Sequence, residues 1–168
     1  MAVIGWGQPS IYIKKLGGTS AKWQLVPTPA EGTTELSTEK GDKQEAKLEG
    51  GANEDVRYNK NTYALSFTLR MTKERIKLIE DQDGIIEDNY SLALVPEDEN
   101  VPGFIIDKAQ VSVEDTWSAE EGGMLTYTFD ALQPSVGTQI KYGKIKVTGS
   151  GTDITDVVID NASTTSEE

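Results

Sequence analysis

The chain has 168 residues, 16 Lys plus Arg against 28 Asp plus Glu, a formal net charge of −12, and neither cysteine nor histidine. These absences exclude a disulfide framework, thiolate chemistry, a Ser-His-Asp triad and the commonest zinc ligands. So acidic a chain is not expected to bind the outside of nucleic acid, because phosphate contacts need a cationic surface. We also expect no membrane anchor, since no apolar run is long enough to cross a bilayer and the N-terminus does not resemble a signal peptide.

The first third of the chain predicts short strands separated by turns. Residues 10–14 and 21–26 are expected to be strands divided by a turn at Gly17-Gly18, and Pro27 and Pro29 end the second strand. Residues 33–48 alternate only weakly and carry many charges, and residues 50–55 form a turn-rich break. We therefore predict a long charged loop over residues 38–61.

Residues 61–83 contain the clearest pattern, a strand followed by a helix. Alternation over residues 62–70 predicts a strand whose apolar face is Tyr63, Leu65, Phe67 and Leu69. Thr72 is a good N-cap for a short helix, Ile76 and Ile79 would supply its apolar stripe, and Asp83-Gly84 would end it. We expect this helix to pack against a sheet.

The second half of the chain again predicts strands. Residues 90–95 are closed by Pro96, residues 103–106 and 108–114 form a strand pair or one bent strand, and residues 117–123 form a loop. Residues 124–132 alternate, with Leu125, Tyr127 and Phe129 on one face, and residues 139–147 form the last confident strand. Short strands punctuated by Gly and Pro predict a mainly β fold: a β-sandwich or barrel with one short helix packed against it.

Two regions differ in composition. Residues 1–147 are predicted to form the β domain, and residues 148–168 an acidic C-terminal extension with five acids and no Lys or Arg. An apolar patch at residues 154–159 is a candidate added strand, so we expect the extension to pack on something.

The chain contains no convincing catalytic, metal-binding or cofactor-binding motif. Asp107, Glu114 and Asp115 have no spacing that defines an acid–base pair, so we do not expect an enzyme. The three tryptophans, Trp6, Trp23 and Trp117, are scattered along the sequence, so burial in a core or an interface is a better prediction than a sugar-stacking platform.

The order of these elements resembles the major tail-tube proteins of bacteriophages and the inner-tube proteins of contractile injection systems. The resemblance covers about residues 8–147: a strand pair, the long Gly-rich loop TEKGDKQEAKLEGGANEDVRYNKN, the strand TYALSFTLR, the helix TKERIKLIED and further strands ending in QIKYGKIKV. It lies in layout and includes no diagnostic motif. The extension at residues 148–168 departs from the minimal tube fold.

The resemblance implies a structural subunit that forms hexameric rings, which stack into a tube with an acidic lumen. Genomic DNA would pass through the lumen without specific binding, and other tail proteins would be partners. It implies a location in the virion tail, assembled in the cytoplasm of the bacterial host. The long loop would contact a neighbouring subunit through Lys40, Asp42, Lys43, Glu45, Lys47, Glu49, Glu54 and Arg57.

Two alternatives stay open. The chain could be the inner tube of a contractile injection system, or a bacterial β-sandwich binding module of carbohydrate or adhesin type. The scattered tryptophans and acidic loops favour a binding module, whereas the missing export signal does not.

Overall fold

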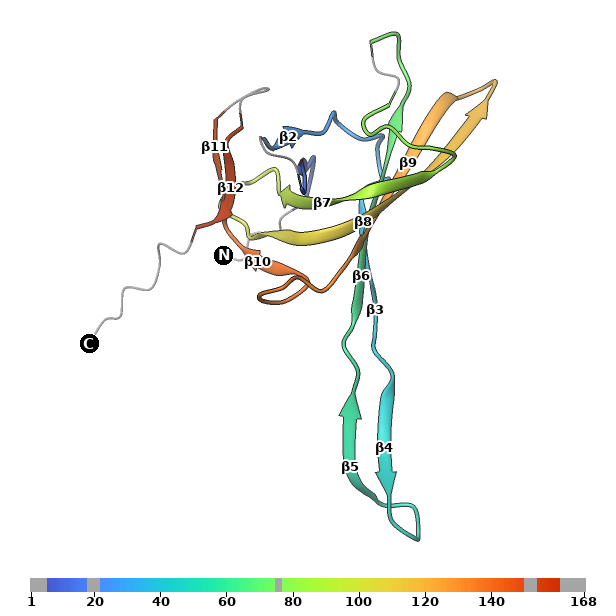
Figure 1. The fold of residues 1–168 in the computed structure, drawn as a ribbon, viewed down its shortest axis with the longest axis vertical. Coiled ribbons are helices and arrows are strands. Elements are labelled where there is room, and N and C mark those ends of the chain that lie inside the picture. The colour runs from blue at the N-terminus through green and yellow to red at the C-terminus, as the bar shows by residue number, and fades with distance from the viewer. Residues whose placement is uncertain (1–5, 18–21, 75–76, 150–153, 161–168) are drawn as a thin grey trace, which may run out of the picture.

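A computed structural model describes residues 6–17, 22–74, 77–149 and 154–160, and the described residues form a mainly β fold (Figure 1). The strands are β1 (Ser10–Lys15), β2 (Gln24–Leu25), β3 (Glu35–Glu39), β4 (Lys43–Lys47), β5 (Asn53–Tyr58), β6 (Thr62–Arg70), β7 (Ile85–Val95), β8 (Gly103–Ser118), β9 (Gly122–Ala131), β10 (Lys141–Gly143), β11 (Ile145–Thr148) and β12 (Asp156–Ile159).

One antiparallel sheet dominates the body. Its strands follow the order β2-β1-β7-β8-β9-β6-β3, and β10 pairs with the first part of β8. The segment between β2 and β3 joins the two edges: Val26 donates its backbone N–H to Ile11 O at 2.8 Å, and Ala30 donates to Thr68 O at 2.8 Å. The sheet therefore curls around one interior, as a barrel does, and its inward face forms the main core.

The core contains the side chains that the alternation predicts. Phe67 is fully buried, with its ring centroid 5.6 Å from that of Phe129 and 5.9 Å from that of Tyr127. The other predicted core residues of β6 and β9 are also at most 2 % exposed: Leu65, Leu69 and Leu125. The pairs Leu65–Phe129 and Phe67–Tyr127 lie opposite each other in the ladder, so the predicted faces of the two strands are confirmed.

The predicted helix after β6 is wrong. The described residues of 71–84 form bends and turns, and Ile76 lies outside the described residues. Tyr127 Oη accepts the backbone N–H of Leu78 at 3.1 Å, and Asp81 Oδ2 accepts that of Gly84 at 2.7 Å. These side chains give the backbone partners that a helix would otherwise supply, and isolated helices this short are marginal. Ile79 is buried, as predicted, although it is not helical.

Strand boundaries also differ from the prediction. β7 begins at Ile85 and not at residue 90, and of the strand predicted at 21–26 only Gln24–Leu25 is a strand, with residue 21 outside the described residues. Residues 103–118 form the single long strand β8, and the predicted loop at 117–123 is instead the tip of the β8–β9 hairpin. The predicted strand 139–147 divides at Lys144: β10 joins the main sheet, and β11 pairs with β12. At Gly143 an added Cβ would lie 2.5 Å from Ile159 Cγ2, so this close packing requires glycine there.

The C-terminal extension contributes a small second core. β12 occupies residues 156–159 of the predicted patch, and Trp23 bridges to Ile154 by a backbone hydrogen bond of 3.1 Å. Ile154 and Val157 pack with Trp23, Ala93 and Ile105. Because Leu92 and Ile106 belong to the main core, their neighbours Ala93 and Ile105 face the opposite side of the sheet. The described part of the extension therefore covers this second face.

Candidate assembly interface

Residues 40–60 form a β-hairpin arm that projects from the body (Figure 1). β4 and β5 continue the directions of β3 and β6 and pair with each other, whereas the sequence predicted a loop. Within the described ranges, neither strand makes extensive contact with any other element. A loop was predicted because the hydrophobic alternation that signals a buried strand is absent where neither face is buried.

The junction between arm and body is closely packed. Gly41 donates its backbone N–H to Asn61 Oδ1 at 3.1 Å, and Asn59 donates its own to Asp42 O at 2.9 Å. A Cβ added at Gly41 would lie 2.0 Å from Asn59 O, so the backbone segments around Gly41 and Asn59 come as close together as only glycine allows. The arm is therefore joined to the sheet by a closely packed, hydrogen-bonded junction.

Ion pairs run along one side of the arm. Glu45 Oε1 lies 2.5 Å from Lys43 Nζ, and Glu45 Oε2 lies 3.3 Å from Lys47 Nζ. The hydrogen bonds from Lys43 and Lys47 lower the pKa of Glu45, and the hydrogen bond to Glu45 raises the pKa of Lys43. Because these groups are exposed, each pair contributes little to stability. Glu45 thus partly offsets the charge of two lysines along a strand that has no core to support it.

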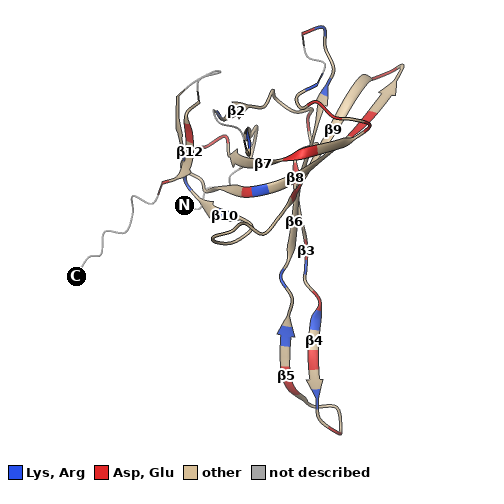
Figure 2. Ribbon diagram, viewed as in Figure 1, with Lys and Arg blue, Asp and Glu red and all other residues tan. Residues whose placement is uncertain are grey.

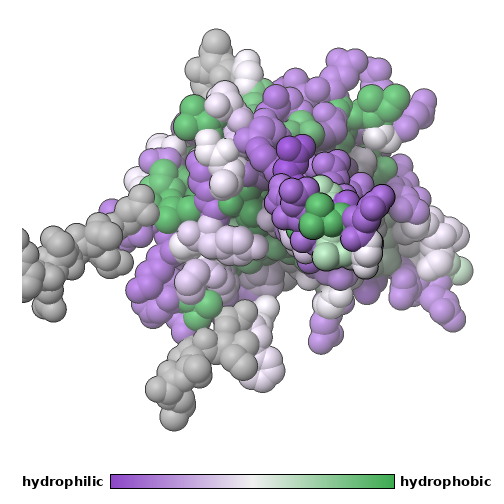
Figure 3. Space-filling view, turned by 90° about the horizontal axis from the view of Figure 1, so that it is seen from below, coloured by the Kyte–Doolittle hydropathy of each residue, from purple (hydrophilic) through white to green (hydrophobic). Residues whose placement is uncertain are grey.

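The arm also exposes apolar side chains. Leu48 at its tip is 51 % exposed, Tyr58 near its base is 54 % exposed, and Val56 lies between them. Lys40 Nζ stands 5.1 Å from the centre of the Tyr58 ring. Viewed from below, along the arm, a small hydrophobic area is surrounded by hydrophilic side chains (Figure 3). This mixture is common where a partner covers an apolar centre inside a polar rim.

The structure places the predicted contact residues together on this arm. All of them are exposed in the single chain: Lys40, Asp42, Lys43, Glu45, Lys47, Glu49, Glu54 and Arg57. Their contact with a neighbouring subunit stays a prediction.

Charge is unevenly distributed between the arm and the rest of the chain (Figure 2). Residues 38–61 contain five Lys or Arg and six Asp or Glu, so the arm is nearly neutral within a chain of net charge −12. Residues 112–123, which form the far end of the β8–β9 hairpin, contain four acids and no base. This acidic tip lies beside Arg70 of β6, whereas the arm adjoins Thr62 at the other end of that strand.

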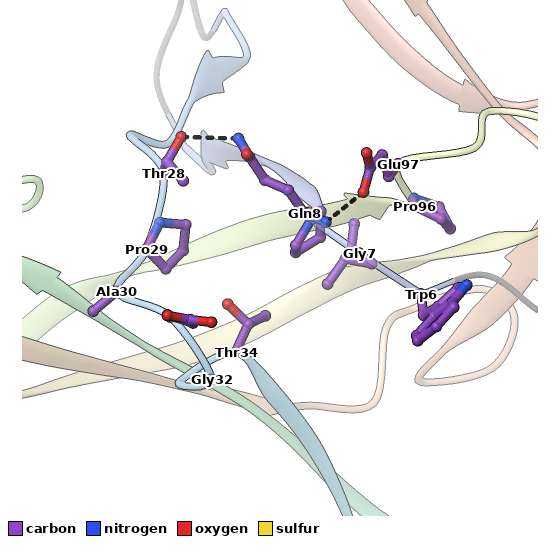
Figure 4. Close-up of a pocket in the computed structure, with 13 residues that line it drawn as sticks. Trp6, Gly7, Gln8, Thr28, Pro29, Ala30, Gly32, Thr34, Pro96 and Glu97 are labelled. Atoms are coloured by element: carbon purple, nitrogen blue, oxygen red, sulfur yellow. Dashed lines mark hydrogen bonds between the residues drawn. The ribbon is translucent and has the colours of Figure 1, made fainter.

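A pocket of about 650 Å³ lies between the N-terminal segment, the β2–β3 connection and the turn after β7 (Figure 4). Trp6 is 82 % exposed at its rim, and the apolar lining includes Pro9, Pro29 and Pro96. Glu97 Oε2 accepts the backbone N–H of Gln8 at 2.9 Å and lies against the backbone of Gly7. Sequence reasoning missed this pocket because its walls come from three distant segments.

The carboxylates considered for chemistry are not brought together as an acid–base pair. Asp107 pairs with Lys141 at 2.7 Å, and Asp115 lies 3.8 Å from Lys77. Among the described residues, no group of acidic side chains could hold a metal ion. No described helix is long and apolar enough to span a membrane.

No protein-family model matches this chain, and comparison with curated proteins finds no match.

Proposed function

We propose that the protein is a structural subunit that assembles with copies of itself into a tube, as the layout of tail-tube proteins implies. The observation that carries this proposal is the β4–β5 arm. It extends from the body, is joined to it by the closely packed junction at Gly41, and exposes Leu48, Val56 and Tyr58. An isolated two-stranded hairpin is marginal in water, so a partner that covers the arm would supply its missing stabilisation.

The free strand edges support the same proposal. β3 ends the main sheet, and both strands of the arm have unpaired outer edges in the single chain. Such edges are a liability in a monomer, whereas ring closure or stacking pairs or covers them. A subunit that has a projecting arm and unpaired strand edges is suited to forming the same contact with one copy after another.

The outward face of β6 and β9 fits the wall of a channel. It carries Ser66, Thr68, Thr126 and Thr128, with Thr68 Oγ1 and Thr126 Oγ1 3.0 Å apart. Asp130 lies at one end of this face and Arg70 at the other. The hydroxyl groups between these ends offer phosphate no cation to replace its counterions, and Arg70 at one end donates to Glu121 O, so we expect nucleic acid to pass without adhering. We propose this face as the inner wall, with genomic DNA as the passing polymer.

The test replaces the arm and leaves its base intact. Since Asn59 N–H donates to Asp42 O at 2.9 Å, residues 43–58 can be replaced by an Asn-Gly turn that joins these two positions. We expect a folded monomer, because the arm buries nothing in the body. The wild-type protein is expected to form rings or tubes in negative-stain micrographs and a larger species in size-exclusion light scattering.

The matched control shortens the acidic β8–β9 tip by replacing residues 119–121 with another tight turn, which should leave assembly unchanged. Tubes formed without the arm would contradict the assembly role of the arm. A wild-type protein that stays monomeric at every concentration would contradict the proposed function.

A further inference from the structure

One cationic side chain of the arm has no partner among the residues that the structure describes. Arg57 lies opposite Gln44 in the ladder, and its side chain makes no hydrogen bond, ion pair or ring contact with any described residue. The other four bases of the arm each have one: Lys40 with the Tyr58 ring, Lys43 and Lys47 with Glu45, and Lys60 with Gln133 Oε1 at 3.2 Å. Among the bases of the arm, Arg57 is thus the one whose side chain has no partner within the described residues, and its guanidinium is exposed.

In its described lining, the pocket beside Trp6 has acidic side chains without basic ones. Glu31 and Glu97 both line it, and none of its described lining residues is basic. Glu97 is held in place by the Gln8 backbone N–H, and neither carboxylate forms an ion pair with a described residue. The indole of Trp6 is largely exposed at the rim. In Figure 4, Trp6, Pro96 and Glu97 lie across the pocket from Pro29, Ala30 and Thr34.

These features suit a guanidinium group. Its plane stacks on an indole and its N–H groups pair with carboxylates, while its alkyl stem lies on apolar surface. The prolines of the lining supply that apolar surface. An anionic ligand would be repelled by Glu31 and Glu97.

The two features lie at opposite ends of one strand. The β2–β3 connection, which carries Glu31, enters β3 at Glu35, and the arm leaves β3 after Glu39 (Figure 1). The arm therefore points away from the pocket of its own chain. If the arm of one copy binds the pocket of the next, the two contacting surfaces differ. Such a heterologous, head-to-tail contact closes into a ring or continues as a filament.

We propose that this pocket receives the arm of a second copy, with Arg57 seated between Trp6, Glu31 and Glu97. This inference rests on the self-assembly proposed above, and it names the receptor surface. The contact joins a cation that has no side-chain partner among the described residues of its own chain to two carboxylates that form no ion pair with a described residue, and it covers an exposed indole. The same contact repeats along the assembly.

The experiment is a charge swap in the full-length protein. Arg57→Glu and Glu31→Arg are expected each to raise the concentration needed for assembly by about tenfold or more. The double variant restores the opposite charges in exchanged positions and should assemble close to the wild-type concentration. Glu87→Arg, on the opposite end of β7 from the pocket, makes the same charge change as Glu31→Arg and should have no effect.

Tryptophan emission gives an independent readout. In a Trp117→Phe background, Trp23 is buried, so a change in emission on assembly reports mainly on Trp6. We expect a blue shift when wild-type chains assemble, and none with Arg57→Glu at the same concentration. Circular dichroism of each variant confirms that it is folded.

Single variants that assemble as the wild type does, or a double variant that gains nothing over the singles, would overturn the pocket contact. In that case assembly of the wild type still supports the proposed function. A wild type that never assembles overturns both proposals. A blue shift of the monomer with maltohexaose, together with normal assembly of Glu31→Arg, would make the pocket a glycan site and overturn the inference.

Discussion

Tyr127 Oη accepts a hydrogen bond from the backbone N–H of Leu78 at 3.1 Å, although the two residues lie 49 positions apart in the chain. Tyr127 belongs to the core face of β9 and is fully buried, and burial raises the pKa of its hydroxyl. The irregular connection between β6 and β7 is thus held by a residue from another strand. This contact ties the segment predicted to be a helix to the centre of the sheet.

Removing this hydroxyl should destabilise the fold. Tyr127→Phe leaves the Leu78 N–H without its partner, and we expect a loss of about 1–3 kcal/mol in the free energy of unfolding, measured in urea. Tyr142→Phe is the control, because Tyr142 is 61 % exposed and should change by less than about 0.5 kcal/mol. Equal effects of the two variants would contradict a structural role for the Tyr127 hydroxyl.

The aromatic cluster of the core should be the most sensitive part of the molecule to truncation. Phe67→Ala removes a fully buried ring that contacts Tyr127 and Phe129, and we expect a loss of about 3–5 kcal/mol. Val136→Ala, at a side chain that is 80 % exposed, is the matched control. A negligible loss at Phe67 in chemical denaturation would contradict the observed packing.

Acid should weaken the connection between β6 and β7. The hydrogen bond from Lys77 at 2.6 Å, followed by that from the Gly84 backbone, lowers the pKa of Asp81 below its ordinary value of about 3.9. A group whose pKa is lowered by folding stabilises the fold above its unfolded pKa and loses that contribution as pH falls through the folded value.

We therefore expect the unfolding free energy of the wild type to fall more steeply below about pH 4 than that of Asp81→Asn. Glu45→Gln is the control and should give the same pH profile as the wild type. Glu45 also has a lowered pKa, but it lies on the arm, away from the core. Parallel pH profiles of wild type and Asp81→Asn would show that Asp81 does not report on global folding.

The junction of the arm should not tolerate a side chain. Gly41→Ala would place Cβ 2.0 Å from Asn59 O, a backbone atom that cannot move without shifting β5. We expect faster hydrogen exchange at the amides of Gly41 and Asn59, and weaker assembly, with the core amides of β6 and β9 unchanged. Thr38→Ala, at an exposed position one residue before the end of β3, should leave both properties as in the wild type.

The assembled protein should not bind DNA. A net charge of −12 per subunit gives phosphate no counterion-release gain, and repulsion is strongest at about 0.01 M salt, where the Debye length is about 30 Å. Electrophoretic mobility of a short duplex should be unchanged at low salt. A variant with Thr126 and Thr128 both replaced by lysine should retard it if this face is accessible, and tight binding by the wild type would contradict the proposed channel.

Much of the body could be predicted from local pattern. The alternation at 62–70 and 124–132 identified the buried residues of β6 and β9, because a strand with one buried face must alternate. The predicted core residue Ile79 is buried even though its predicted helix is absent. Hydrophobicity alone determined that burial, whereas the backbone conformation depended on Tyr127, 48 positions away in sequence.

The candidate interface could be predicted only in part. The composition of residues 38–61 predicts a long charged loop, but it does not indicate the paired strands, since β4 and β5 have no buried face. The Trp6 pocket had no signal in the sequence, because Gln8, Pro29 and Glu97 meet there only after the sheet has curled.

By itself, the sequence determined the class of fold, the inward faces of the well-patterned strands and the acidic character of the surface, because each depends on the composition and period of neighbouring residues. The tertiary structure decided what depends on distant contacts. It divided residues 139–147 between two sheets at Lys144, turned a predicted helix into a connection held by Tyr127, and extended a predicted loop into a paired arm. Non-local hydrogen bonds and close backbone approaches determine these features, and they follow from which strands become neighbours.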